Sequence, residues 1–390
     1  MLQYALEFGI LSKGFSTLLA GCIPTPAIAY LIRSLNASAG IIISGSHNSF
    51  YDNGIKIFLK NGIKITEEKE FFIEKQLDNS LYNSSYSQNF GLSKKIRNAV
   101  KKYIDFCKST FPRNINLSKF TIVLDCANGS TYHVAPKIFQ DLGAKVITSS
   151  ICPNGININK NSGSTDILKL KKLVISAQAD IGLAFDGDGD RVIMVDHLGN
   201  EVNGDQIIYI IAQEYLTNNQ LKGGVVGTLM TNMGIISGLK KLGIPFCVTK
   251  KIGDRYLYKK MKEKKWILGA EQSGHIILLD KHSTGDGIIA SLQILLTMIR
   301  NNKSLYFLSN QVKLFPQILL NVFFNKEKDF EKDTRFQSIL YKSRKILGKS
   351  GRFFIRKSGT EPYVRIMVEG ENYLKIKKLA YDISDIIKCI

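Results

Sequence analysis

One order of elements recurs along this sequence: a β-branched run, a glycine-containing turn, an amphipathic segment and a second β-branched run. It is clearest in residues 120–148 (FTIVLDCANGSTYHVAPKIFQDLGAKVIT) and 223–249 (GGVVGTLMTNMGIISGLKKLGIPFCVT). The amphipathic segments end at Gly143 and Gly243, and glycine is the expected residue just past the end of a helix. Strands that alternate with helices in this way predict serial α/β domains with parallel or mixed sheets.

The length and the last part of the chain indicate more than one kind of domain. The 390 residues are too many for one ordinary hydrophobic core, so we expect two to four domains. The first hundred residues imply a third copy of the α/β pattern. From about Ile318 the pattern changes to two strand-like runs around RKSGTEP, followed by a C-terminal helix.

The net charge of +20 suits a nucleic acid, an acidic membrane surface or a phosphorylated substrate. Compositional drift toward Lys, Asn and Ile explains it equally well. The lysines within 259–265 fit the wet face of a helix better than an RNA-binding patch, so we expect no nucleic-acid partner. Six scattered cysteines without a CxxC pair predict a reduced, cytoplasmic protein without structural zinc. The longest apolar stretch, 287–299, is too short to span a membrane.

Three aspartates at alternate positions, Asp186, Asp188 and Asp190, follow an apolar run in AFDGDGDRVIMVD. Like charges this close repel, so the arrangement needs a cation. An EF-hand calcium loop is excluded, because position six is Arg191 and position twelve is His197 where glycine and glutamate belong. Three oxygen ligands on a short loop leave room for waters and a phosphate, which is how magnesium is usually held.

Two other loops carry candidate functional residues. Ser46 follows a buried strand in IIISGSHN, where it is either a nucleophile, with His47 as its base, or a capping serine. In GAEQSGHIILLD, Glu271, Ser273 and His275 lie at the mouth of a predicted strand pair, and side chains grouped this way suit sugar hydroxyls.

A third candidate loop lies near the C-terminus, in RKSGTEPYVR. It combines cations, hydroxyl groups and free backbone N–H groups, which together make a cradle for phosphate. Its residues are Arg356, Lys357, Ser358, Gly359 and Thr360, and Arg365 is near enough in sequence to join them.

These motifs occur in one order, and together they resemble the α-D-phosphohexomutase superfamily over essentially the whole chain. Within the superfamily, the sequence is most similar to the bacterial members that act on amino sugars. The similarity lies in the segments SGSHNSFYDNGIKIF, FDGDGDRVIMVD, AEQSGHIILLDKHSTGDGI and IRKSGTEP. The resemblance implies three related α/β domains with mixed sheets and a smaller C-terminal α+β domain around a central cleft. We expect their limits at 1–112, 113–204, 205–312 and 313–390.

The resemblance also implies an isomerase that interconverts glucosamine 6-phosphate and glucosamine 1-phosphate. Ser46 would be a phosphoserine, and magnesium would be held by Ser46 and the three aspartates. Lys56 and His275 would move the proton of the attacking hydroxyl, and Arg191 would contact the reacting phosphate. Glu271 and Ser273 would bind the sugar. The substrate's other phosphate would be held by Arg356, Ser358, Gly359, Thr360 and Arg365.

Further expectations follow from the same resemblance. A 1,6-bisphosphate serves as intermediate and activator, and the product feeds UDP-N-acetylglucosamine and peptidoglycan synthesis. The protein would be a cytoplasmic monomer or homodimer with small sugar phosphates as partners, without a membrane partner. A phosphoglucomutase or phosphomannomutase of the same superfamily, or a non-catalytic sugar-phosphate-binding remnant, remains the alternative.

Two features of this sequence depart from the superfamily. Ser49 stands where the serine loop usually has proline, which we expect to loosen the loop. No initial strand or TDGIRG-type loop precedes the first helix. We therefore expect an unpaired strand edge in the first domain and an incompletely covered first helix, and a longer form to be more stable and more active.

Overall fold

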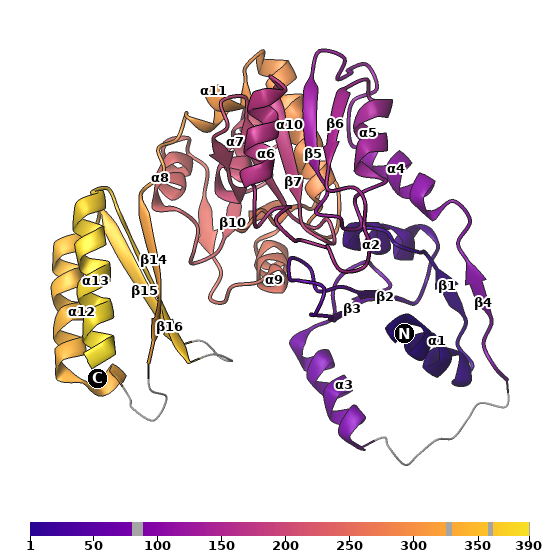
Figure 1. The fold of residues 1–390 in the computed structure, drawn as a ribbon, viewed down its shortest axis with the longest axis horizontal. Helices are drawn as coiled ribbons and strands as arrows, with labels where there is room; N and C mark the ends of the chain where they lie inside the picture. Colours follow the sequence, from indigo (N-terminus) through magenta and orange to yellow (C-terminus); the bar gives the residue numbers. More distant parts are fainter. Residues whose placement is uncertain (80–88, 325–329, 358–361, 390) are drawn as a thin grey trace. The chain divides into compact units, whose positions relative to one another are not determined.

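The computed structural model describes residues 1–79, 89–324, 330–357 and 362–389. By internal packing the chain divides into two compact units. The first consists of residues 1–231 and 239–311, and the second of residues 232–238 and 312–390. Figure 1 shows the elements of both units, coloured along the sequence.

The N-terminal part of the first unit contains two separate two-stranded sheets. Strand β1 (Thr17–Leu19) pairs in parallel with β4 (Ser93–Lys95), and β2 (Ala39–Ile43) pairs antiparallel with β3 (Ile55–Leu59). Four helices accompany them: α1 (Leu2–Ser12), α2 (Thr25–Ser34), α3 (Glu67–Asn79) and α4 (Ala99–Ser109). Helix α2 packs on β2 and β3 through a small core with Ala29, Ile32 and Phe58 at its centre.

The two sheets of this part are small. Within the described part of the chain, β1 and β2 each have a hydrogen-bonded neighbour on one side only. On helix α1, the side chains of Tyr4 and Phe8 are 72% and 71% exposed.

The second α/β pattern forms a five-stranded mixed sheet. Its strands, in spatial order, are β6 (Lys145–Ser149), β5 (Thr121–Asp125), β7 (Ile181–Phe185), β8 (Val192–Asp196) and β9 (Glu201–Val202). Strand β5 is parallel to β6 and β7, and β8 runs antiparallel to β7. Helices α5 (Ala135–Asp141) and α6 (Leu168–Ser176) belong to this domain. Every residue of β7 and β8 is buried, so the turn between them is anchored on both sides by core strands.

The third pattern forms a four-stranded sheet in the order β11 (Phe246–Val248), β10 (Val225–Gly227), β12 (Leu268–Ala270) and β13 (Ile276–Leu278). Its helices are α7 (Gly204–Thr217), α8 (Met233–Lys241), α9 (Asp254–Lys264), α10 (Gly287–Asn301) and α11 (Leu305–Ser309), and residues 233–238 of α8 are grouped with the second unit. The predicted strand–helix–strand order of both repeats is confirmed. Gly143 and Gly243 follow their helices with φ of +97° and +74°, a conformation that glycine adopts without strain.

The second unit is the smaller α+β domain that the sequence predicted. Strand β16 (Tyr363–Gly370) lies between β14 (Gln317–Phe323) and β15 (Gly351–Lys357), and all pairs are antiparallel. A short 3-10 turn (Phe330–Lys332) precedes α12 (Thr334–Leu347), and α13 (Tyr373–Cys389) ends the chain. Both long helices pack on one face of this sheet (Figure 1).

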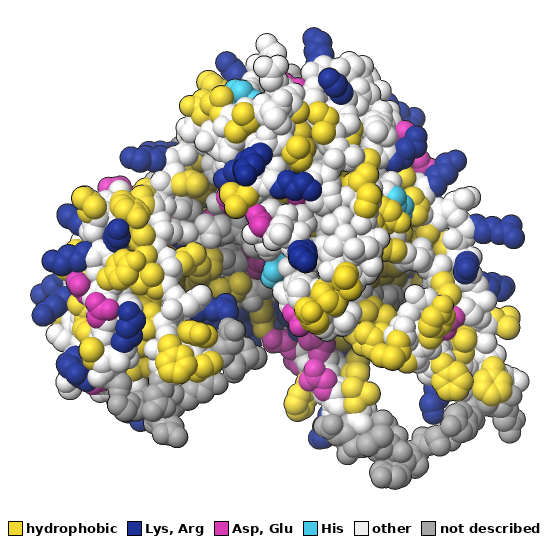
Figure 2. Space-filling model, viewed as in Figure 1, with side chains coloured by type: hydrophobic (Ala, Val, Ile, Leu, Met, Phe, Trp, Pro, Cys, Tyr) yellow, Lys and Arg dark blue, Asp and Glu magenta, His cyan; other side chains and the backbone are white. Residues whose placement is uncertain are grey.

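Charged side chains are distributed over the surface. Figure 2 shows lysine and arginine side chains scattered over the visible face, without one continuous basic patch. Among the residues that the structure describes, no helix is long and apolar enough to cross a membrane.

Candidate active site

The site is built around the turn between β7 and β8, whose backbone is held by N–H groups from three other segments. The N–H of Thr25 donates to the carbonyl of Asp188 (2.9 Å), that of Ser130 to Gly187 (2.8 Å), and that of Gly287 to Gly189 (3.1 Å). Three consecutive carbonyl groups of the turn therefore accept hydrogen bonds from other segments, and the three aspartate side chains point toward one another.

Glycine is required between the aspartates for two different reasons. A Cβ atom on Gly187 would lie 2.5 Å from the carbonyl oxygen of Ser46, so a side chain would push the serine loop away. Gly189 has φ +72°, in the left-handed region that other residues rarely adopt. The alternation of aspartate and glycine thus allows the turn to be tight and the serine loop to lie against it.

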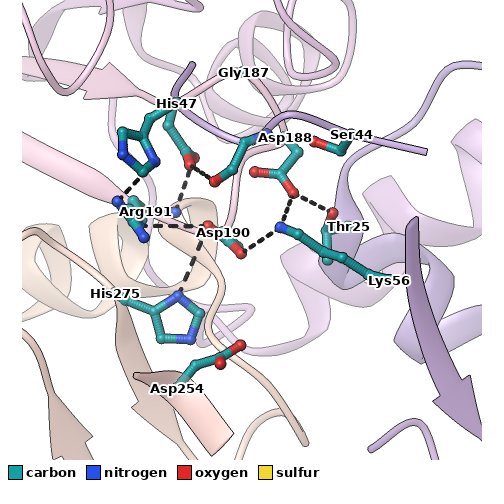
Figure 3. A network of polar contacts seen from close by, with 12 residues as sticks. Thr25, Ser44, His47, Lys56, Gly187, Asp188, Asp190, Arg191, Asp254 and His275 are labelled. Atoms are coloured by element: carbon teal, nitrogen blue, oxygen red, sulfur yellow. Dashed lines mark hydrogen bonds and ion pairs between the residues drawn. The ribbon is translucent and has the colours of Figure 1, made fainter. Parts of the chain in front are cut away.

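The three aspartates gather in one place, each with its own partners, and Figure 3 shows Asp188 and Asp190 beside Lys56. Ligand oxygens of Asp186, Asp188 and Asp190 lie within 4.8 Å of one another, and all three residues are buried. Oδ2 of Asp186 accepts a hydrogen bond from the Ser46 hydroxyl (3.0 Å). The Lys56 ammonium bridges Oδ2 of Asp188 and Oδ2 of Asp190, the second at 3.3 Å.

These residues fit a divalent cation. Oδ1 of Asp188 is buried and has no hydrogen-bond partner among the described residues, and the buried Oδ1 of Asp190 has only the longer ion-pair contacts to His275 (3.7 Å) and Arg191 (3.9 Å). A buried carboxylate oxygen without a partner is costly, and a metal ion would relieve that cost. Oxygen ligands of this kind suit the hard cation Mg²⁺. Asp186, Asp188, Asp190 and the Ser46 oxygen are therefore the candidate metal ligands.

The electrostatics of the site follow from burial and from like charges. Burial, together with Asp190 and Asp188, raises the pKa of Asp186 well above its usual range. Burial also opposes ionisation of Asp190, but Lys56, His275 and Arg191 outweigh it and hold the pKa of Asp190 well below its usual range. Burial would lower the pKa of Lys56, but Asp190 and Asp188 raise it, so Lys56 remains a cation.

Ser46 lies in a strained loop that several hydrogen bonds stabilise. Its φ is +55°, which is uncommon for a residue other than glycine. Its N–H donates to the Ser44 hydroxyl (2.8 Å). His47 contacts the Arg191 guanidinium through Nδ1 (3.1 Å), and the Ser46 hydroxyl donates to Asp186, so the described contacts give no Ser–His pair. The N–H of Asn48 closes a turn onto Gly45 (3.0 Å) although proline is missing from the next position.

The turn between β12 and β13 brings a second group of side chains to the aspartates. Nδ1 of His275 lies 3.7 Å from Oδ1 of Asp190. Burial lowers the pKa of His275, but Asp190 outweighs this effect and the pKa is raised. Oε1 of Glu271 accepts the N–H of Gly253 (2.9 Å), and Ser273 lies 3.5 Å from Oε2 of the same glutamate. The structure therefore brings Ser46, the three aspartates and Glu271 together with the cations of Lys56, Arg191 and His275.

The predicted phosphate cradle belongs to the second unit. Arg356 on β15 lies directly opposite Arg365 on β16, and both side chains are exposed. Two arginines side by side on an exposed sheet face suit an anion. The other three residues predicted for this cradle, Ser358, Gly359 and Thr360, lie outside the described residues.

Sequence reasoning missed three polar residues at this site. The Thr25 hydroxyl donates to Oδ2 of Asp188 (2.5 Å). The Asn159 side chain contacts the serine loop. Asp254 lies beside His275 (Figure 3) and pairs with Lys64 (2.8 Å). Burial raises the pKa of Asp254, but His275 and Lys64 outweigh that effect and lower it. Each lies far in sequence from the residue it contacts, so no local pattern identifies it.

Comparison with known domains assigns the fold class. The models for phosphoglucomutase/phosphomannomutase match in order along the chain: alpha/beta/alpha domain I at residues 1–83, domain II at 101–199, domain III at 203–315 and the C-terminal domain at 319–386. A solved structure of a phosphoglucomutase/phosphomannomutase family protein from Burkholderia thailandensis has the same fold. Its TM-score is 0.81 at 19% identity, covering 100% of this chain and 86% of that one.

Curated relatives indicate which family within this class the chain belongs to. Phosphoglucosamine mutase of Buchnera aphidicola subsp. Acyrthosiphon pisum is 68% identical over 390 residues, covering 100% of this chain and 87% of that protein. Phosphoglucosamine mutase of Cronobacter sakazakii is 52% identical over 392 residues, with the same coverage. The chain therefore belongs to the phosphoglucosamine mutase family of the phosphohexomutases, as its motifs suggested.

A further solved structure shares the fold. It is the N-acetylphosphoglucosamine mutase of Aspergillus fumigatus in complex with GlcNAc-6P and magnesium, at a TM-score of 0.71 and 17% identity, covering 94% of this chain and 92% of that one.

Proposed function

We propose that this chain interconverts glucosamine 6-phosphate and glucosamine 1-phosphate through a phosphoserine at Ser46 and a 1,6-bisphosphate. The observation that carries the proposal is the position of the Ser46 hydroxyl. It donates to Asp186 at 3.0 Å, within a cluster that also contains Asp190, the Lys56 ammonium, and Asp188, whose Oδ1 has no hydrogen-bond partner among the described residues. The relatives that share half or more of this sequence bear the name of this activity.

In the first half of the reaction, the free hydroxyl of the substrate attacks the phosphorus atom of phosphorylated Ser46. A bond forms between that hydroxyl oxygen and phosphorus, the bond from Oγ of Ser46 to phosphorus breaks, and the hydroxyl proton is passed on to Oγ of Ser46. The products are the 1,6-bisphosphate and the free serine. In the second half Oγ of Ser46 attacks the phosphorus of the other phosphate, the bond from that phosphorus to the sugar oxygen breaks, and the serine proton passes to that oxygen. The phosphoserine is then restored and the monophosphate isomer is released.

Mg²⁺ held by the three aspartates would neutralise charge on the phosphoryl group that is transferred. The chain's own residues supply the rest. Arg191, half-buried beside the aspartates, would contact the same phosphoryl group. Lys56 and His275 are the candidate carriers of the hydroxyl proton, because both side chains reach the aspartate cluster.

The remaining assignments concern the substrate. Glu271 and Ser273 are proposed to bind sugar hydroxyls, and Arg356 and Arg365, with the loop between their strands, to hold the phosphate that does not react. The Ser273 hydroxyl beside the Glu271 carboxylate and the two exposed arginines opposite each other on β15 and β16 support these roles.

Several wider expectations stay part of the proposal. They are the four-domain limits, the requirement for Mg²⁺ and the bisphosphate activator, the cytoplasmic location, and the supply of UDP-N-acetylglucosamine for peptidoglycan. All six cysteines are free, as a reducing compartment requires. The oligomeric state, monomer or homodimer, remains a prediction.

A substrate panel tests this function. Glucosamine 6-phosphate, glucose 6-phosphate and mannose 6-phosphate are each assayed with Mg²⁺ and a trace of 1,6-bisphosphate, for the wild type and for Ser46→Ala. We expect the highest kcat/KM with the amino sugar, no turnover by Ser46→Ala, and one phosphoryl group on Ser46 by peptide mass spectrometry. A preference for glucose or mannose phosphate would favour the alternative mutases. Ligand binding without any turnover would favour a non-catalytic remnant, and phosphate on Ser44 or Ser49 with Ser46→Ala active would refute the phosphoserine.

A further inference from the structure

The backbone of the serine loop is held by a side chain that lies far from it in sequence. Nδ2 of Asn159 donates to the carbonyl oxygen of Ser46 (2.9 Å) and to that of Asn48 (2.7 Å). Asn159 lies in the turn at 158–160, between β6 and α6. One carboxamide therefore holds both carbonyls that flank His47.

The chemistry of the two acceptors fixes the orientation of this carboxamide. Both partners are carbonyl oxygens, which only accept hydrogen bonds, so the NH₂ group of Asn159 faces them with its two donors. Its own Oδ1 is buried and has no hydrogen-bond partner within the described residues. The side chain is thus committed to the two carbonyls of the serine loop.

Asn159 is itself held in position, as a residue that positions another must be. Its N–H donates to the carbonyl of Ala127 (2.9 Å), in the loop that follows β5. Asn128 in the same loop ties the rest of the segment down: its Nδ2 donates to the carbonyl of Asn157 (3.3 Å), and its Oδ1 accepts the N–H of Cys152 (3.1 Å). Asn159 is therefore anchored to a loop of the five-stranded sheet, from which the aspartate turn also projects.

The serine loop needs such support because Ser46 has φ +55°. This conformation costs free energy and persists only when the surroundings enforce it. On one side the loop lies against Gly187, where a Cβ would be 2.5 Å from the Ser46 carbonyl and 2.9 Å from Nδ2 of Asn159. Asn159 and Gly187 thus meet at the same carbonyl oxygen.

We propose that Asn159 is a positioning residue for phosphoryl transfer: it fixes the backbone of Ser46 so that Oγ faces the aspartate cluster. This inference rests on the proposed role of Ser46. Asn159 contacts the loop backbone rather than the reacting atoms, so its loss should affect the transfer step more than substrate binding. Small misplacements of a reacting group can reduce a rate by about 100-fold.

The main variant is Asn159→Gly. Asn159 has φ +56°, which glycine adopts readily, so the substitution removes the two donors and keeps the backbone conformation. Asn159→Asp is the second variant, because it keeps the shape of the side chain and replaces the donors with oxygen. The matched control is Asn161→Gly, in an exposed asparagine with φ +50° on the same segment.

Four quantities are measured for each variant in the full-length chain with Mg²⁺: kcat, KM for glucosamine 6-phosphate, Tm, and the rate at which phosphate is lost from Ser46 to water without substrate. For Asn159→Gly we expect kcat to fall roughly 10- to 100-fold, with KM and Tm close to the control and with faster loss of phosphate. Asn159→Asp should behave similarly, which keeps the test informative if the glycine variant folds poorly.

The outcomes separate the two hypotheses. A wild-type kcat in both Asn159 variants, in an enzyme that Ser46→Ala inactivates, would overturn the positioning role and leave the proposed function intact. A fall in kcat only in parallel with a fall in Tm would also overturn it, because that marks a purely structural residue. Turnover by Ser46→Ala would refute the proposed function itself, whatever the Asn159 variants do.

Discussion

We expect Asp188→Asn to lose Mg²⁺ binding while the chain still folds. Oδ2 of Asp188 accepts the Thr25 hydroxyl and the Lys56 ammonium, whereas its buried Oδ1 has no hydrogen-bond partner in the described part of the chain. The amide oxygen of an asparagine can keep the first two contacts. Its NH₂ group then takes the place of Oδ1, and an amide NH₂ cannot bind a cation.

The charges around the aspartate turn set the sign of the stability change. The pKa of Asp186 is raised, which favours its neutral form, so the charges of Asp188 and Asp190 face the Lys56 ammonium and the Arg191 guanidinium. The substitution leaves the Lys56 ammonium with one charged partner fewer. We therefore expect the Tm of Asp188→Asn in EDTA to lie somewhat below that of the wild type. For the wild type, a metal at 100 times its Kd adds about 2.7 kcal/mol to stability, which corresponds to roughly a few degrees in Tm.

The assay combines thermal unfolding in EDTA and in excess Mg²⁺, calorimetric titration with Mg²⁺, and turnover. The wild type should gain in Tm with Mg²⁺ and Asp188→Asn should not, while its turnover falls by about 10²–10³-fold, as when a charge-stabilising contact is lost. Asp105→Asn, which changes the same charge at an exposed position on α4, should resemble the wild type. An unchanged magnesium shift in Asp188→Asn would refute the assignment of Asp188 as a ligand.

Three further changes are expected to have defined effects. Arg356→Ala should raise KM about 10- to 100-fold with little change in kcat, because a charged hydrogen bond to a phosphate contributes about 1.5–3 kcal/mol in ground and transition states alike. Gly187→Ala should lower both Tm and turnover, because the added Cβ would lie 2.5 Å from the Ser46 carbonyl. Burial raises the pKa of Asp286 to about 6 from 3.8, although the Ile289 N–H and the Tyr103 hydroxyl favour the carboxylate. Two pKa units correspond to about 3 kcal/mol, so Asp286→Asn, measured in EDTA, should raise Tm above pH 6 and give no gain below pH 4.

For each of these changes, one result would contradict the reasoning. An unchanged KM in Arg356→Ala would place the phosphate elsewhere. Gly9→Ala, where no atom lies within 4 Å of the added Cβ, should leave activity unchanged, and wild-type activity in Gly187→Ala would contradict the close approach. For Asp286, folding favours the protonated form, so its stabilising contribution is complete below the unfolded pKa and is lost as pH rises through 6. Asp286 is the N-cap of α10 and accepts the N–H groups of Ile288 and Ile289. A loss of Tm of equal size at all pH values in Asp286→Asn would show that the carboxylate is needed for more than this cap.

The strand and helix order was predictable because each element follows a local pattern. The repeats at 120–148 and 223–249 fold as the sequence predicted, with glycine in the left-handed conformation after each helix. Strand β4 was not predicted, because Ser93–Lys95 is polar and exposed and shows no alternation. It forms because β1 offers a parallel partner far away in sequence.

The residues of the candidate site likewise fall into those that a local sequence pattern indicates and those that only tertiary packing brings in. Asp186, Asp188 and Asp190 are recognisable because three carboxylates crowd one short turn. Ser46 is recognisable because it follows a strand within a motif that resembles the serine loop of the superfamily. Thr25 had no such signal: it is an ordinary threonine at the start of α2, and only tertiary packing brings its hydroxyl to Asp188. The same packing determines the left-handed φ of Ser46, which no pattern around SGSHN indicates.

The crowding of three aspartates into five residues has a structural basis that goes beyond the metal. The N–H groups that hold the turn belong to Thr25 on α2, Ser130 after β5 and Gly287 on α10, so elements of three successive α/β patterns converge on it. In a free turn the carboxylates would spread apart, because like charges repel. Here the fixed carbonyls leave each side chain little freedom, and the nearby cations offset most of the repulsion. The packing of the three α/β domains therefore keeps the ligand oxygens within 4.8 Å of one another. A core substitution that loosens any one of these domains should weaken metal binding even when it lies far from the aspartates.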